Sequence, residues 1–187
     1  MSNINLIKKS FIKEKLSFIK SRKFSFEINR IELPNGHEGE YGSIKHPGAA
    51  LAVPVNNNGK VIILRQYRFA VSRYLLEFPA GTLEDGETPF ESIKREIQEE
   101  TGYSANLWDE LGVLVPAPGY ADEEIHLFLA RKLNKLESIP KGDLDEDIEV
   151  LEFSPKELDQ LIASGNETLD AKTITAWFRA KQFLQIK

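Results

Sequence analysis

The sequence predicts an α/β fold in which a mixed β-sheet is covered by helices on both faces, preceded by an N-terminal antiparallel strand segment. Short apolar runs typical of strands lie on both sides of one well-specified helix near the middle of the chain. Two further helical patterns, at residues 155–163 and 171–185, close the chain. Residues 24–33 alternate between apolar and polar side chains and end in a Pro-Asn-Gly turn, which predicts strand structure ahead of the main domain.

Apolar runs bounded by turn residues predict the strands of the main domain. They lie at 49–55, 61–65, 75–78, 111–115, 124–130 and 148–153. The turn sequence Asn56-Asn57-Asn58-Gly59 follows the first run, so we expect the first two strands to form a hairpin. The lysine-rich start is expected to form a short helix around residues 6–18 or an irregular arm. The predicted division is therefore an N-terminal arm with strands at 1–45 and a main domain at 46–187.

Composition narrows the class of protein. The chain has 187 residues, enough to bury a sizeable core, and its 24 basic against 29 acidic residues give a net charge of −5, which argues against binding duplex nucleic acid by charge. The absence of cysteine excludes a disulfide scaffold, a thiolate zinc site and a cysteine nucleophile. No apolar run approaches the ~20 residues of a membrane span, and the start has no signal-peptide pattern. We expect a cytoplasmic protein with no membrane or nucleic-acid partner.

The best-specified element is a helix from residue 89 to residue 101. Thr88-Pro89-Phe90-Glu91 forms a capping box with proline at the first helical position. Gly102 stands where a glycine would end the helix. At 100° per residue, an apolar stripe must face the core, and it is formed by Phe90, Ile93 and Ile97.

Three carboxylates lie beside that stripe. Glu96, Glu99 and Glu100 fall within an arc of about 100°, and their repulsion costs stability unless a cation lies among them. An acidic helix face open to solvent is the alternative interpretation. However, Glu100 borders the stripe, and Arg95 is four residues before Glu99 and placed to hold that carboxylate. Clusters of oxygen ligands suit Mg²⁺ or Mn²⁺, so we expect a divalent metal site.

The same segment resembles the Nudix box, glycine-x5-glutamate-x7-arginine-glutamate-aliphatic-x-glutamate-glutamate-x-glycine-aliphatic. The matching residues are Gly81, Glu87, Arg95, Glu96, Ile97, Glu99, Glu100 and Gly102, with Tyr103 in the last aliphatic position. A chance match at one position has a probability on the order of one in ten million. From about Phe24 onward the chain is similar to the ADP-ribose pyrophosphatase group, through residues 46–49, 65–68, 76–81 and 116–126.

The resemblance implies a Nudix-type α/β/α sandwich and assigns roles to the box. Glu96 and Glu100 would bind metal directly, with Glu99 as a further or water-mediated ligand. The backbone carbonyl of Ala80 would be an extra ligand, and Arg95 would orient the glutamates. Glu87 would anchor the loop before the helix, while Gly81 and Gly102 have structural roles in the motif.

Residues outside the box complete the implied site. In this group the general base is a glutamate on a late loop, and Glu146 is the favoured match, with Asp145 and Asp147 as alternatives. Arg68 and Arg65 would contact the diphosphate or the terminal ribose, although Arg65 could simply end a strand. Glu77 would accept hydrogen bonds from ribose hydroxyls or pair with an arginine. The loop containing Pro118 and Gly119 is expected to contact substrate.

The resemblance implies a Mg²⁺-dependent enzyme, with Mn²⁺ possible, that hydrolyses ADP-ribose to AMP and ribose 5-phosphate. One alternative keeps the chemistry but takes another nucleotide sugar, such as GDP-mannose or ADP-glucose. A non-catalytic ADP-ribose sensor is disfavoured because the box is intact. The group also implies a homodimer in which the N-terminal strands of one subunit help to build the other subunit's site.

Overall fold

The computed structural model describes residues 9–140 and 147–185, which divide into two compact units. The N-terminal unit contains the described residues up to Pro47 together with Ala117–Glu123. The main unit contains Gly48–Pro116 and the described residues from Glu124 onward. The sequence places a boundary between residues 45 and 46, but it does not predict that a segment beyond residue 116 belongs with the first unit. No helix of the described residues is long and apolar enough to cross a membrane.

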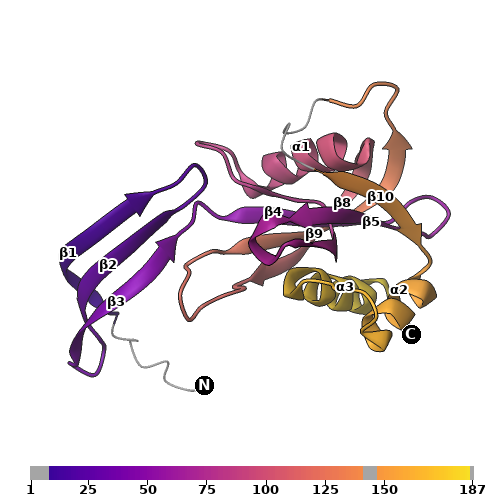
Figure 1. Ribbon diagram of the computed structural model, residues 1–187. Helices are drawn as coiled ribbons and strands as arrows, with labels where there is room; N and C mark the ends of the chain where they lie inside the picture. Colours follow the sequence, from indigo (N-terminus) through magenta and orange to yellow (C-terminus); the bar gives the residue numbers. More distant parts are fainter. Residues whose placement is uncertain (1–8, 141–146, 186–187) are drawn as a thin grey trace, which may run out of the picture. The chain divides into compact units, whose positions relative to one another are not determined.

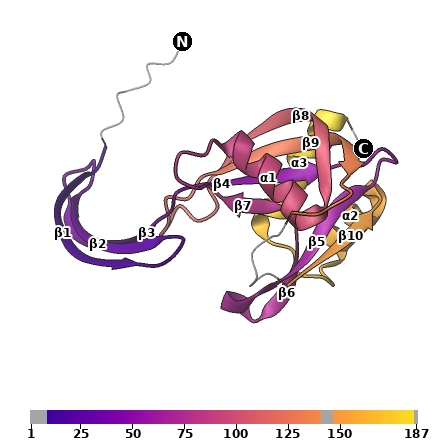
Figure 2. The same ribbon diagram turned by 90° about the horizontal axis from the view of Figure 1, so that it is seen from above.

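The N-terminal unit is built on a three-stranded antiparallel sheet, drawn in indigo and violet in Figures 1 and 2. Its strands, in the order β1-β2-β3, are β1 (Phe11–Lys20), β2 (Ser25–Glu32) and β3 (Glu38–Lys45). The expectation of a helix or an irregular arm near residues 6–18 is therefore wrong for the described part of that segment. The reason is pairing with neighbours: β1 lies along β2, and Lys13 and Lys15 reach Glu32 and Glu27, each at 2.7 Å. Tertiary context overrides local helix propensity here.

The main unit has two sheets and three helices (Figure 1). One sheet has the order β7-β4-β9-β8, with β4 parallel to β9 and the other neighbours antiparallel. The other has the order β10-β5-β6 and is antiparallel. The strands are β4 (Ala49–Pro54), β5 (Val61–Arg68), β6 (Arg73–Glu77), β7 (Ala80–Thr82), β8 (Tyr103–Leu114), β9 (Ile125–Lys135) and β10 (Ile148–Phe153). The helices are α1 (Pro89–Thr101), α2 (Pro155–Ser164) and α3 (Ala171–Leu184), and a 3₁₀ turn, η1 (Phe69–Val71), joins β5 to β6.

The central strand β4 separates two apolar clusters and is buried along its whole length. Ala50 and Ala52 pack in the cluster that contains Ile93 and Ile97 of α1. The alternate residues, represented by Leu51, pack in the larger cluster with residues of α2 and α3. Successive side chains of a strand point to opposite faces, so a strand with a core on each side must be apolar throughout. The predicted arrangement of a mixed sheet with helices on both faces is confirmed.

The predicted hairpin between the first two strands of the main domain is only partly right. The turn forms as expected, since the Asn56 N–H donates to the Lys60 carbonyl over 2.8 Å and Val55 and Val61 form a single antiparallel bridge. Beyond that bridge the strands separate, because β4 pairs with β7 and β9 while β5 pairs with β6 and β10. A turn signal predicts a change of chain direction, but other strands compete for the same edges.

The sequence also missed β3, β7 and residues 103–110 of β8. Strand β8 begins at Tyr103, directly after α1, and its pairing with β9 is interrupted by a bulge near Gly112, which has a φ of 91°. A bulge inserts an extra residue and breaks the alternation on which strand prediction depends. The other predicted strands and both C-terminal helices form, with ends that shift by a few residues.

Candidate active site

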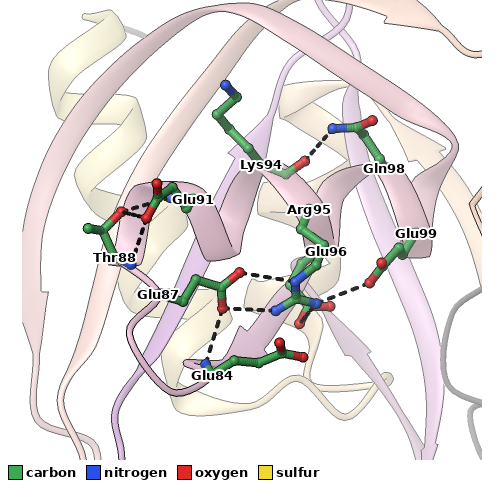
Figure 3. A network of polar contacts seen from close by, with 9 residues as sticks. All are labelled: Glu84, Glu87, Thr88, Glu91, Lys94, Arg95, Glu96, Gln98 and Glu99. Atoms are coloured by element: carbon green, nitrogen blue, oxygen red, sulfur yellow. Dashed lines mark hydrogen bonds and ion pairs between the residues drawn. The ribbon is translucent and has the colours of Figure 1, made fainter.

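Helix α1 is fixed at both ends as predicted. The Glu91 N–H donates to Thr88 Oγ1 over 3.3 Å, and the Glu91 carboxylate accepts from the Thr88 N–H over 2.9 Å (Figure 3). At the other end, Gly102 has a φ of 71°, in the left-handed region that favours glycine, and its N–H donates to the Gln98 carbonyl. One residue of the apolar stripe differs from expectation. Phe90 is 41% exposed, because it covers the edge of the cluster with its ring against Trp108.

Arg95 lies at the centre of the polar network on α1 (Figure 3). Its Nε and Nη2 atoms donate to the two carboxylate oxygens of Glu87, each over 3.1 Å. Its Nη1 atom contacts Glu96 at 2.7 Å and Glu99 at 3.1 Å. The Glu84 N–H donates to Glu87, which ties the loop before the helix to the same group. One guanidinium therefore organises three carboxylates from a loop and two helical turns.

Glu96 lies against the backbone of Gly81 in β7. A Cβ atom built on Gly81 would be only 1.8 Å from Glu96 Oε1 and 2.1 Å from Glu96 Cδ. Gly81 is not one of the glycines with a positive φ. The reason for glycine at this position is therefore space rather than backbone conformation. Any side chain at position 81 would displace the Glu96 carboxylate.

Glu100 connects α1 to the residue before Gly81. Its side chain is buried, and its Oε2 atom accepts a hydrogen bond from the Ala80 N–H over 3.0 Å. The short strand β7 is held in turn by pairing of Ala80 with Leu51 of β4. Four of the residues selected from the sequence, namely Ala80, Gly81, Glu96 and Glu100, thus come together between β7 and α1.

Electrostatics at this cluster favour a cation. Glu87, Glu96, Glu99 and Glu100 bring four carboxylates to one side of α1, with Arg95 as the guanidinium among them. Hydrogen bonds from Arg95 lower the pKa of Glu87, and the same contacts with Glu87 raise the pKa of Arg95, so both stay charged. An excess of negative charge remains.

The donor set fits a hard divalent ion, since carboxylate and carbonyl oxygens are the ligands that Mg²⁺ and Mn²⁺ prefer. In the described parts of the chain no three acidic or histidine side chains already converge as a ligand set. The contacts of Arg95 explain this arrangement, because its guanidinium bridges Glu96 and Glu99. Arg95 contacts only one oxygen of each of these two carboxylates, so the second oxygen of each could bind a metal ion while Arg95 stays in place.

A second charged cluster adjoins the first and contains two residues selected from the sequence. Glu77 is 1% exposed, and its carboxylate accepts two hydrogen bonds of 2.7 Å from Arg68, at Nε and Nη2. Lys172 of α3 contacts the same carboxylate. Burial alone would raise the pKa of Glu77, but these two cations outweigh it and lower the pKa to about 2. The hydrogen bonds to Glu77 and, to a smaller extent, the negative charge of Glu100 raise the pKa of Arg68.

Of the two interpretations of Glu77, the structure shows the pairing with an arginine. The sequence does not identify Lys172 as a site residue. Its neighbour Asp170 is a recognisable N-cap residue for α3. The contact of Lys172 with Glu77, however, spans 95 positions and has no local sequence signal.

Arg65 is separate from this cluster. Its guanidinium lies 4.3 Å from the ring centre of Tyr74 and 3.6 Å from a carboxylate oxygen of Glu149. The Tyr74 hydroxyl donates to Asp147 over 2.6 Å. Asp147, an alternative for the general base, is therefore engaged by Tyr74. Glu146 and Asp145 lie outside the described residues.

Pro118 and Gly119 belong to the N-terminal unit, not to the unit that contains α1. Their loop is attached to β3, because the Ile44 N–H donates to the Tyr120 carbonyl over 2.8 Å and Lys45 pairs with Asp122 at 2.8 Å. The structure assigns this substrate-loop candidate to a different unit from the charged clusters.

Similarity to known proteins agrees with this geometry. Residues 45–178 match the NUDIX domain, and the chain belongs to the Nudix family. It is 40% identical over 160 residues to an ADP-ribose pyrophosphatase of Bacillus subtilis, covering 86% of this chain and 84% of the relative. A GDP-mannose pyrophosphatase of Cronobacter sakazakii is 31% identical over 185 residues and covers 92% of each chain. A crystal structure of an ADP compounds hydrolase superposes with a TM-score of 0.79 at 25% identity, covering 96% of both chains. Nudix hydrolases generally need a divalent metal ion.

Proposed function

We propose that this protein hydrolyses the diphosphate bond of ADP-ribose, giving AMP and ribose 5-phosphate. The observation that carries the proposal is that the α1 carboxylates meet Ala80 and Gly81 of β7, three residues after the Glu77 that pairs with Arg68. The carboxylates supply oxygen ligands, and the arginine supplies a cation for a phosphate oxygen. The Nudix relatives named for ADP-ribose and for other nucleotide sugars support the same class of substrate.

Each side chain has one task in this proposal. Mg²⁺ or Mn²⁺ would be held by Glu96, Glu99 and Glu100 together with the Ala80 carbonyl. Mg²⁺ is preferred because proteins usually bind it through carboxylates together with substrate phosphates. When bound, the metal neutralises phosphate charge and makes the attacking water more acidic. Arg95 holds the glutamates in place, Arg68 donates to the diphosphate, and Arg65 is a candidate contact further along β5. Glu146 would take the proton of the attacking water, with Asp145 as the alternative.

The test is hydrolysis by the purified full chain of ADP-ribose, GDP-mannose, ADP-glucose and NADH, with Mg²⁺ and with Mn²⁺. We expect ADP-ribose to be the fastest substrate and Glu100→Gln to lose at least a hundredfold in kcat. The matched control is Glu137→Gln, which removes an exposed carboxylate and should be neutral.

Other outcomes decide between substrates. Faster turnover of GDP-mannose or ADP-glucose would support the proposed site but identify a different substrate. GDP-mannose is included because one similar protein is a GDP-mannose pyrophosphatase. Absence of hydrolysis together with tight ADP-ribose binding would refute the proposed enzymatic activity and favour a non-catalytic ADP-ribose sensor.

We also propose that the protein is a homodimer that uses the N-terminal sheet. Strand β1 exposes large apolar side chains, including Phe11, Ile12, Phe18 and Ile19, each at least half exposed. Such a surface is unusual for an isolated chain and fits a second copy. Light scattering should give twice the monomer mass, and the double substitution Phe18→Asp with Ile19→Asp should halve that mass.

The net charge of −5 and the absence of cysteine support a cytoplasmic enzyme without a nucleic-acid partner. Cell fractionation tests the location.

A further inference from the structure

Four charged side chains connect the beginning of α3 to the α1 carboxylates. Asp170 contacts Lys172, Lys172 contacts Glu77, and Glu77 is paired with Arg68. Glu77 lies three residues before Ala80, whose N–H donates to Glu100 of α1. The chain of contacts therefore begins on a helix that carries none of the Nudix box and ends beside the box.

The first turn of α3 is rigidly attached to the strand that leads into the site. Asp170 caps α3 by accepting from the Thr173 N–H over 2.8 Å, and Thr173 Oγ1 accepts from the Phe78 N–H over 3.0 Å. The Leu76 N–H donates to the Thr168 carbonyl over 2.9 Å. Thr173 and Phe78 are buried, so these bonds are shielded from water. Lys172 is thus presented to Glu77 from a fixed backbone.

Two cations and two carboxylates alternate along this series of contacts, so their formal charges balance. Arg68 is one of the two cations on the Glu77 carboxylate. Lys172 supplies a second positive charge to the same carboxylate, while Asp170 is itself stabilised by the N-terminus of α3. Arg68 is thus anchored on its Glu77 side, while its side chain remains 41% exposed.

Geometry leaves one edge of this guanidinium open. Arg68 donates Nε and Nη2 to Glu77, and its Nη1 atom has no hydrogen-bond partner among residues 9–140 and 147–185. The bidentate pair fixes the plane of the guanidinium, so Nη1 points in a defined direction. An oriented guanidinium donor is suited to a phosphate oxygen.

We propose that Lys172 is a positioning residue for the diphosphate: it acts through Glu77 to fix the orientation of the Arg68 guanidinium. This role rests on the proposed function, since it assigns Arg68 to the diphosphate. It predicts an effect on substrate binding and not on the chemical step, because Lys172 itself is turned toward Glu77 and Asp170.

The test compares Lys172→Met and Lys172→Arg with Lys181→Met. Lys181 is on the same helix and makes a similar ion pair, 2.6 Å from Asp159, which makes it a matched control. For each variant we would measure kcat and KM for ADP-ribose with Mg²⁺, the dissociation constant for ADP-ribose in EDTA by calorimetry, and thermal unfolding.

We expect Lys172→Met to raise KM and the EDTA dissociation constant about tenfold, with kcat within threefold of wild type. Lys172→Arg should recover most of the affinity, and Lys181→Met should match wild type. Equal affinities of Lys172→Met and wild type for ADP-ribose would overturn the role of Lys172. A loss of affinity in both Lys172→Arg and Lys181→Met as large as that in Lys172→Met would overturn it as well.

Two further results complete the design. Wild-type protein that hydrolyses no diphosphate but still binds ADP-ribose in EDTA would refute the proposed function alone, and the binding series would still judge Lys172. If Lys172→Met unfolds below the assay temperature, Lys172→Gln, which keeps a donor but no charge, is judged by the same criteria.

Discussion

The Glu96 carboxylate occupies the space where a side chain at Gly81 would begin, 1.8 Å from the position of a Cβ atom. This close approach joins the first glycine of the Nudix box to one of its central glutamates. The box therefore fixes two elements, β7 and α1, at the distance that the carboxylates require.

Gly81→Ala should lose at least tenfold in kcat because the methyl group would displace Glu96. Gly86→Ala is the control, since position 86 has open space around it but a positive φ of 82°. That substitution should lower the free energy of unfolding by about 1 kcal/mol through backbone strain and keep activity. If both variants retain full kcat, Glu96 is not held by this contact.

Arg95→Met should make protein stability more dependent on Mg²⁺. Without the guanidinium, the carboxylates of Glu87, Glu96 and Glu99 repel one another, so a divalent ion relieves more strain. Thermal unfolding with 5–10 mM Mg²⁺, roughly saturating for such sites, should raise the Tm of the variant by several degrees more than that of wild type. An equal rise in both proteins would contradict a shared cation site.

The Glu77 pair should make stability depend on acid. The pKa of Glu77 in the folded protein is about 2, below its ordinary value of 4.5. A lowered folded-state pKa gives stability that is complete above about pH 5 and is lost as the pH falls from 4.5 toward 2. The difference in free energy of unfolding between wild type and Glu77→Gln should therefore be constant above pH 5 and shrink below pH 4.5. Urea titrations across that range measure it, and a difference that is independent of pH would refute the assignment.

Tyr74→Phe should reduce kcat about fivefold with little change in stability. The Tyr74 hydroxyl holds Asp147 at the start of the segment that enters β10, and this hydrogen bond raises the pKa of the tyrosine. Loss of the bond frees the residue that follows Glu146. Steady-state kinetics measure the effect, and Tyr67→Phe, the neighbouring tyrosine, serves as the control. Similar values of kcat in both variants and in wild type would argue that Asp147 has no part in positioning the base.

Much of the site could be predicted because its signals are local. The capping box, Gly102 and the three glutamates of α1 lie within 15 residues, and a helix places them by its fixed rotation per residue. The same holds for the Arg95–Glu99 contact, which joins positions four apart. Residues 24–33 and the C-terminal helices were also readable from periodicity.

Other features could not be read because they depend on which elements meet. The lysines of β1 are compatible with a helix in isolation, but in the folded chain they pair with glutamates of β2. The chain reverses direction at residues 56–59, yet β4 and β5 belong to different sheets. In both cases the energy of long-range pairing outweighs the local preference.

Helix α1, its ends and its set of carboxylates follow from the sequence alone, because they depend on spacing along a rigid helix. Three other features follow only from the folded chain: Arg68 and Lys172 share Glu77, Glu96 lies against Gly81, and Ala117–Glu123 joins the N-terminal unit. Those contacts join residues far apart in the chain, and burial of the charged groups makes each depend on all its partners.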